Sequence, residues 1–154
     1  MNWDLDEREK GLLAFTQRLF GIRRANPALR RRYFFRGKPV ESGAKDVTWL
    51  RADGREMTDA EWNDSTSHSL GMLIRGEAAD EIDERGRAIT GDTLLLVVNN
   101  REGEEHWCLP RLEIPGMWIL IVDTDRPTIA DEPVDEITLA PFSLVLLRYQ
   151  LETP

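Results

Sequence analysis

Residues 22–27 read Ile22-Arg23-Arg24-Ala25-Asn26-Pro27, and they separate two parts of the chain with different hydrophobic periods. Pro27 disfavours helical geometry at the residue before it, so we expect a helix to end at Asn26. Downstream, short runs of β-branched and aromatic residues alternate with Gly, Pro, Asp and Asn, which is typical of strands and turns. Upstream, apolar side chains recur at the spacing of an amphipathic helix, at Leu12, Phe15, Leu19 and Ile22.

The predicted helix begins near Asp4, which can serve as N-cap residue while Glu7 completes a capping box three residues later. Leu13 and Phe20 widen the apolar stripe beyond that of an ordinary surface helix. A face this broad must pack against something large. A single helix ahead of an all-β domain often belongs to the preceding domain, so we expect its partner surface to lie outside this chain.

Short strands dominate the rest of the sequence and predict a mainly β fold, an antiparallel β-sandwich that follows the N-terminal helix. Residues 52–54 are expected to form a turn, and Asp59–Trp62 a short helix. Asn99–Glu104 has the composition of a hairpin loop, and Ala140–Phe142 that of a tight corner between the last two strands. The predicted strands are Arg32–Arg36, Asp46–Arg51, Ser69–Arg75, Thr93–Asn99, Glu104–Leu109, Trp118–Asp123, Glu136–Leu139 and Ser143–Gln150.

The composition describes an acidic chain of 154 residues with a net charge of −8, which disfavours a general nucleic-acid binder. Its apolar runs, such as Leu94–Val98, are far shorter than the ~20 residues of a membrane helix, so no membrane partner is expected. Residues 1–7 lack the features of a signal peptide. Because Cys108 is the only cysteine, no internal disulfide can form, and we expect a cytoplasmic protein.

A basic stretch, Arg23–Lys38, contains seven Lys and Arg and no acidic residue. The aromatic run Tyr33–Phe35 lies within it, and this combination can mark a site for single-stranded nucleic acid. The structural alternative is that Arg30–Arg32 lie at a domain seam with their stems packed on apolar surface. The rest of the chain is strongly acidic and repels polyanions, so we expect no nucleic-acid partner.

No motif for catalysis or metal binding is evident. His68 and His106 have no Cys or His at ligand spacing, and the acidic run Asp80–Glu84 lacks the pattern of an EF-hand loop. His106 and Cys108 share one strand face, but nothing orients the histidine, and we expect a buried, inert thiol. The sequence therefore predicts no catalytic, cofactor-binding or metal-binding residue in this chain.

Tryptophan is abundant, and an exposed indole can stack on a sugar ring. For the tryptophans inside predicted strands, core packing is the simpler explanation. Trp62 is the best candidate for an exposed one. The five are Trp3, Trp49, Trp62, Trp107 and Trp118.

Several segments resemble a known family. Leu12–Leu19 together with Arg23–Arg30 looks like the last barrel helix of α-amylase-family enzymes. Lys45-Asp46-Val47-Thr48-Trp49-Leu50-Arg51-Ala52-Asp53-Gly54, followed by Trp62-Asn63-Asp64, is similar to bacterial glycogen debranching enzymes of the isoamylase type. The similarity continues through Ser69–Ala78, Asp92–Asn99 and Pro141–Leu147.

This resemblance implies a parent glycosidase with a catalytic (β/α)8 barrel and a C-terminal β-sandwich, which hydrolyses α-1,6 branch linkages in glycogen or limit dextrin. Residues 1–27 would then be the terminal helix of a truncated barrel, and residues 28–154 the sandwich domain. None of the family's catalytic carboxylates has a matching position here, so the chain is expected to be an accessory domain, inactive alone. The barrel would be its partner, with α-glucan as a further ligand.

Two other interpretations stay open at this point. The chain could be an autonomous carbohydrate-binding module, which predicts retention on glycogen. It could also be a small binding protein that uses the basic stretch, which predicts strongly salt-dependent binding of nucleic acid. We also expect the first helix either to be poorly anchored or to pair with another copy of the chain, that is, to self-associate through its exposed face.

Overall fold

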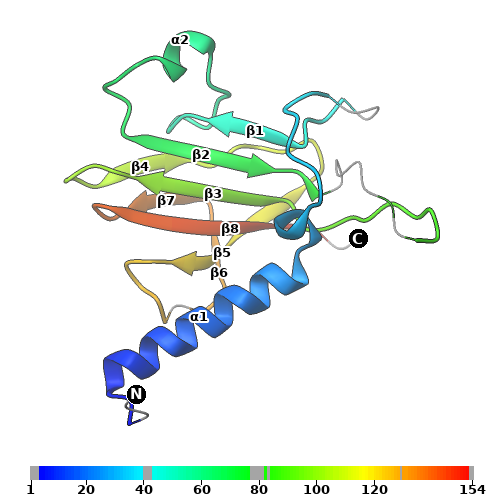
Figure 1. Cartoon of the computed structure of the whole chain (residues 1–154). Coiled ribbons are helices and arrows are strands. Elements are labelled where there is room, and N and C mark those ends of the chain that lie inside the picture. Colours follow the sequence, from blue (N-terminus) through cyan, green and yellow to red (C-terminus); the bar gives the residue numbers. More distant parts are fainter. Residues whose placement is uncertain (1–3, 40–42, 77–81, 83, 129, 153–154) are drawn as a thin grey trace.

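The helices lie before the β domain and within one of its loops. Helix α1 spans Glu7–Ala25, the 3₁₀ turn η1 spans Pro27–Arg30, and the short helix α2 spans Asp59–Trp62. Figure 1 shows α1 to one side of the strands, with its N-terminal end projecting beyond them. The computed structural model describes most of the chain, namely residues 4–39, 43–76, 82, 84–128 and 130–152.

The strands form two antiparallel sheets, which confirms a mainly β, sandwich-like fold. The smaller sheet pairs β4 (Glu105–Cys108) with β7 (Glu136–Leu139). The larger sheet has the order β1-β2-β3-β8-β5-β6, and these strands span Val47–Leu50, Ser69–Ile74, Leu94–Asn99, Ser143–Leu151, Gly116–Asp123 and Glu132–Val134. Seven of the eight predicted strands are thereby confirmed, with ends displaced by at most two residues.

One predicted strand is wrong, and one strand is not evident from the sequence. Arg32–Arg36 forms no strand. Instead the backbone N–H groups of Arg36 and Gly37 donate to the carboxylate of Asp46. The strand that the sequence does not reveal is β6, which lies at the edge of the larger sheet and contains Pro133. Proline lacks an N–H group and is confined to such edges, so β6 leaves only a weak signal.

The segment from Asn99 to Glu104 is not a hairpin loop, contrary to prediction. β3 pairs with β2 and β8, whereas β4 pairs with β7, so the chain crosses here from one sheet to the other. The side-chain amide of Asn99, which is 1% exposed, donates to the carbonyl groups of Gly103 and Ala140 at 2.9 Å each. Ala140 opens the corner at which the chain returns from β7 to β8, and this corner is confirmed.

Helix α1 begins later than predicted but ends as predicted. Asp6, rather than Asp4, is the N-cap residue, because its Oδ1 accepts the Glu9 N–H at 2.8 Å and the Glu9 carboxylate accepts the Asp6 N–H at 2.9 Å. The sequence contains two overlapping Asp-x-x-Glu patterns, so spacing alone could not choose between them. At the other end, Pro27 takes the first position of η1, where a missing N–H costs nothing.

Trp107 joins the two sheets. This β4 residue is 1% exposed, and its ring lies against the backbone of Gly71 in β2. A Cβ atom at Gly71 would lie 2.7 Å from Cζ3 of Trp107, so the ring fits only because residue 71 has no side chain. The surrounding core consists of Leu50, Leu73, Leu95, Val97, Trp118, Leu120, Ile137, Leu139, Val145 and Leu147.

The opposite face of the larger sheet is covered less completely. Ala28 of η1 is buried there, and Phe15 and Ile22 of α1 pack against the same cluster as half-buried side chains. No side chain of α1 is buried, however, and Leu12 and Phe20 are 65% and 64% exposed. The helix therefore rests on the sheet through a narrow contact. The cluster beneath it consists of Ile74, Leu94, Ile119, Ile121, Val122 and Leu146.

A buried ion pair fixes the segment that follows η1. Nη1 of Arg31 lies 3.0 Å from Oδ2 of Asp46, and the two side chains are 6% and 4% exposed. Burial by itself raises the pKa of Asp46, but hydrogen bonds from the N–H groups of Arg36 and Gly37 and from Arg31 outweigh it, so its pKa lies below the ordinary value. Arg31 also lies over the ring of Phe35, at 4.6 Å from its centroid. This part of the basic stretch has a structural role.

Candidate functional site

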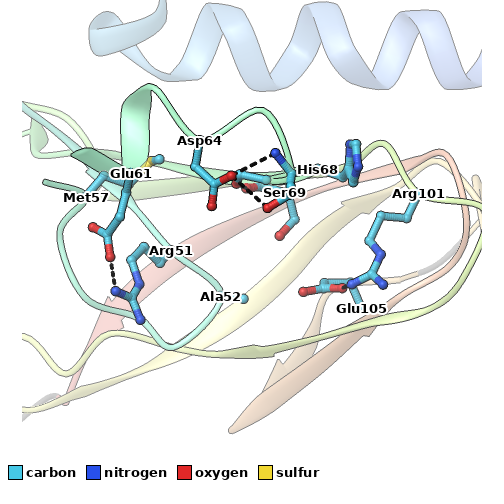
Figure 2. A pocket seen from close by; sticks show the side chains of 11 residues that line it. Arg51, Ala52, Met57, Glu61, Asp64, His68, Ser69, Arg101 and Glu105 are labelled. Carbon is cyan, nitrogen blue, oxygen red and sulfur yellow. Dashed lines mark hydrogen bonds and ion pairs between the residues drawn. The ribbon is translucent and has the colours of Figure 1, made fainter. Parts of the chain in front are cut away.

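A cleft opens between the α2 loop and the connection from β3 to β4 (Figure 2). Its volume is about 310 Å³. One wall is formed by residues 51–69, and the other by Arg101 and Glu105. We call it the polar cleft, because most of its lining side chains are charged or polar: Arg51, Glu61, Asp64, Thr66, Ser67, His68, Ser69, Arg101 and Glu105, with Ala52 and Met57.

The α2 loop is held in place by a reciprocal set of polar contacts. The N–H and the hydroxyl group of Thr58 donate to the Glu61 carboxylate at 2.7 and 2.9 Å, which stabilises the first turn of α2. The same carboxylate pairs with Arg51, which follows β1 (Figure 2). Arg51 also lies 2.6 Å from the carboxylate of Asp53. These contacts tie α2 to the end of β1.

The carboxylates of this wall are held in their ionised form. A hydrogen bond from the Thr58 N–H, then one from its hydroxyl group, lowers the pKa of Glu61. Hydrogen bonds from the hydroxyl and N–H groups of Thr66 lower the pKa of Asp64 in the same way. A general acid in glycoside hydrolysis needs a raised pKa. Glu61 and Asp64 therefore do not suit that role.

The opposite wall carries a second ion pair, in which Nη1 of Arg101 lies 2.7 Å from Oε2 of Glu105. Both arginines of the cleft thus face a carboxylate at short range. Paired charges attract a polyanion weakly. The polar cleft is suited to bind neutral, hydroxyl-rich molecules or water.

His106 and Cys108 lie on the same face of β4, as their spacing predicts, but the expected burial of the thiol is wrong. Cys108 is exposed, because the buried face of β4 is the one that carries Trp107. Nδ1 of His106 lies 2.8 Å from the hydroxyl oxygen of Thr138 on the paired strand β7. The histidine is thus positioned by a neighbouring strand, and no contact joins it to the thiol among the described residues.

The tryptophans differ in burial. Trp107 and Trp118 are buried, which confirms the core interpretation for these two, whereas Trp49 is half-buried and lies outside the buried core. Trp62 is 48% exposed. Trp3 lies outside the described residues.

The acidic run Asp80–Glu84 lies mostly outside the described residues as well. In the part of the chain that the structure describes, no group of three or more His, Cys, Asp or Glu side chains is arranged to hold a metal ion. Nor does that part contain a helix long and apolar enough to cross a membrane.

A family model described as isoamylase, C-terminal, matches residues 46–141. The chain belongs to the isoamylase C-terminal family. The matched region runs from Asp46 to the corner before β8, so it includes both walls of the polar cleft.

Similar proteins of this family are much longer than the chain. A glycogen operon protein GlgX homolog of Mycobacterium tuberculosis is 30% identical over 98% of this chain and 22% of its own length. A glycogen debranching enzyme of Dickeya chrysanthemi is 38% identical over 48% of the chain and 10% of its own length. An isoamylase of Flavobacterium sp. is 25% identical over 79% of the chain and 15% of its own length. The chain thus spans about a fifth of the first of these relatives.

The sequence did not reveal the polar cleft. Its walls come from two loops separated by some thirty residues, and they meet only because β2 and β3 pair along their whole length. The one local signal was the Thr58–Glu61 spacing, which favours the start of a short helix.

Proposed function

We propose that this member of the isoamylase C-terminal family is the non-catalytic accessory domain of an enzyme that hydrolyses α-1,6 branch linkages in glycogen or limit dextrin. Membership of the family and the names of the similar proteins support this function. So does the fact that the chain spans only 22% of its Mycobacterium tuberculosis relative. The catalytic carboxylates would belong to the remaining part of such an enzyme.

The observation that carries the proposal is the outer face of α1. Leu12, Leu13 and Phe20 are 65%, 47% and 64% exposed on a helix that has no buried side chain. Several large apolar side chains exposed on one helix favour an interaction site there. Its occupant would be the catalytic barrel, with residues 1–27 as the last barrel helix and residues 28–154 as the sandwich that packs against it.

In this role the chain stabilises the enzyme without taking part in bond cleavage. Covering the α1 face would remove apolar surface from water on both partners, which contributes about 25 cal/mol for each Å² buried. In the absence of the barrel, the same face would pair with a second copy of the chain. We place the protein in the cytoplasm, where the exposed thiol of Cys108 would stay reduced.

A chimera tests the proposal. The C-terminal region of the Dickeya chrysanthemi debranching enzyme is replaced by this chain, and hydrolysis of branched limit dextrin is measured. We expect the chimera to be soluble and active, the enzyme without any C-terminal region to aggregate, and this chain alone to be inactive. Debranching by the isolated chain, or full activity of the truncated enzyme, would refute the accessory role.

A pair of substituted chimeras tests the proposed contact, one changed within the α1 face and one changed outside it as the matched control. A chimera with Leu12→Asp and Phe20→Asp should lose soluble enzyme, because two charges would be buried at the seam. A chimera with Phe34→Asp, whose side chain is 96% exposed and lies outside α1, should behave as the parent chimera does.

A further inference from the structure

A second hollow lies on the other side of the α2 loop. Its volume is about 340 Å³, and it adjoins the polar cleft, with which it shares six lining residues: Met57, Glu61, Asp64, Ser67, His68 and Ser69. Unlike that cleft, it is bordered by Trp62 and floored by Leu70 and Val98. We call it the tryptophan groove. It is lined mainly by apolar surface, with polar groups along its rim.

The indole of Trp62 is a fixed wall rather than a loose side chain. It meets the ring of Trp49 edge to face, with centroids 5.4 Å apart and planes at 78°. Trp49 belongs to β1 and is itself half-buried, so the pair anchors α2 to the sheet. Trp62 nevertheless stays 48% exposed. An aromatic ring that is held by packing and is about half exposed to solvent can stack against an apolar face of a ligand.

The floor of the groove is a cross-strand pair. Leu70 of β2 lies directly opposite Val98 of β3, and both side chains are half-buried. At the end of β3, the backbone N–H of Asn100 donates to the carbonyl of His68 at 2.8 Å. This hydrogen bond holds the polar rim at a fixed distance from the apolar floor.

The charges at the rim disfavour an anionic ligand. The charged residues that line the groove, among those the structure describes, are Glu61, whose carboxylate is paired with Arg51 behind it, and Asp64. Both carboxylates accept hydrogen bonds from neighbouring threonines, Thr58 and Thr66, and so remain ionised. They repel phosphate and nucleic acid but can accept hydrogen bonds from hydroxyl groups.

From these features we propose that the tryptophan groove binds a short segment of α-glucan chain. A glucose ring has apolar C–H faces and a rim of hydroxyl groups, which match the wall of Trp62 and the rim carboxylates respectively. The proposal rests on the accessory function above, and it adds that this domain itself contacts the polymer.

The experiment uses this chain and maltoheptaose as the probe. Indole N–H signals are followed by two-dimensional NMR during titration, and retention in native gels containing glycogen gives the affinity. We expect the Trp62 signal to shift most and the signals of the buried Trp107 and Trp118 to stay in place. Trp62→Ala should weaken retention by about tenfold, as loss of an aromatic anchor does at other interfaces. Trp62→Tyr should keep part of the binding.

The controls separate a binding defect from a folding defect. Phe34→Ala removes an aromatic ring that is 96% exposed and lies outside the groove, and it should leave retention unchanged. Asn100→Ala removes a rim side chain without touching the indole, so it keeps the test valid if Trp62→Ala unfolds; it should weaken retention several-fold.

Two results would overturn the proposal. One is the absence of any Trp62 shift at millimolar maltoheptaose in a folded chain. The other is a Trp62→Ala chimera that loses its assembly with the barrel, which would make the groove a seam between domains. Neither result bears on whether the unsubstituted chimera debranches limit dextrin, so failure here leaves the accessory function standing.

Discussion

The two faces of the larger sheet are made from similar residues but differ in what covers them. On the inner face, Trp107 is 1% exposed and its ring fits closely over Gly71. On the outer face, α1 contributes no buried side chain and leaves Phe20 64% exposed. The contrast teaches that the sandwich is stabilised from within, while α1 carries apolar surface that this chain does not use.

The largest effect is expected at Trp107. Trp107→Ala should lower the free energy of unfolding by about 4 kcal/mol, because it leaves a large cavity between the sheets. Urea denaturation followed by circular dichroism measures the loss. The matched change on the outer face, Phe20→Ala, should cost less than about 0.5 kcal/mol. Equal losses at the two positions would remove the distinction between the faces.

A smaller effect is expected at the buried ion pair. Asp46→Asn should cost about 3 kcal/mol, because it removes the carboxylate that pairs with the buried guanidinium of Arg31. The folded-state pKa of Asp46 is lowered, so its stabilisation is complete above the unfolded pKa of about 4 and is lost as the pH falls through the folded value. Unfolding curves between pH 7 and pH 2 test this.

The control for Asp46 is an exposed carboxylate. The side chain of Glu7 is 91% exposed and pairs with Lys10. Glu7→Gln removes this surface ion pair, and the variant should keep the stability and pH dependence of the parent chain. If Asp46→Asn retains the same acid-dependent loss as the parent chain, the carboxylate of residue 46 is not its source.

The next effect is steric. Gly71→Ala should cost about 2 kcal/mol, because the new Cβ would lie 2.7 Å from the ring of Trp107 and 3.3 Å from Cβ of Leu50. Gly11→Ala on α1 should instead raise stability by about 0.5 kcal/mol, since nothing lies within 4 Å and alanine favours the helix. Thermal unfolding of both variants compares the faces directly. A neutral Gly71→Ala would mean that the two sheets can separate at low cost.

The smallest effect on stability is expected on the outer face of α1. The double variant Leu12→Ser and Phe20→Ser should change the free energy of unfolding by less than about 0.5 kcal/mol, because both side chains are mostly in water. It should, however, weaken self-association in sedimentation experiments. Amide exchange of residues 12–20 should be fast in a monomer. Slow exchange there, or a large loss of stability, would show that α1 is anchored to the sandwich after all.

Local patterns predicted most of the elements correctly. Short apolar runs bounded by turn residues, such as Ser69–Ile74, predicted strands, and the Asn26-Pro27 sequence predicted the end of the helix. Local patterns failed where two equivalent motifs competed or where the sequence signal of an element was weak. Because two Asp-x-x-Glu patterns overlap, Asp4 was predicted as the N-cap residue in place of Asp6. Pro133 concealed the edge strand β6.

Pairing between distant segments could not be predicted in the same way. Asn99–Glu104 has the composition of a hairpin loop. In the structure, however, the buried side-chain amide of Asn99 donates to the carbonyl groups of both Gly103 and Ala140, and so ties this segment to the corner before β8. Cys108 was expected to be buried because it lies within a predicted strand, yet the neighbouring Trp107 takes the inner face. A shift of one residue moves every side chain of a strand to the other face.

The sequence by itself determined the order of elements and the change from helix to strands at Pro27, because turn chemistry and hydrophobic period act over a few residues. It also carried enough local similarity to place the chain in the isoamylase C-terminal family. Only the tertiary structure decided which strands pair, which faces are buried, and that the α2 loop borders a polar cleft on one side and the tryptophan groove on the other. Those features depend on contacts between segments that lie far apart along the chain, and packing across the whole domain selects them.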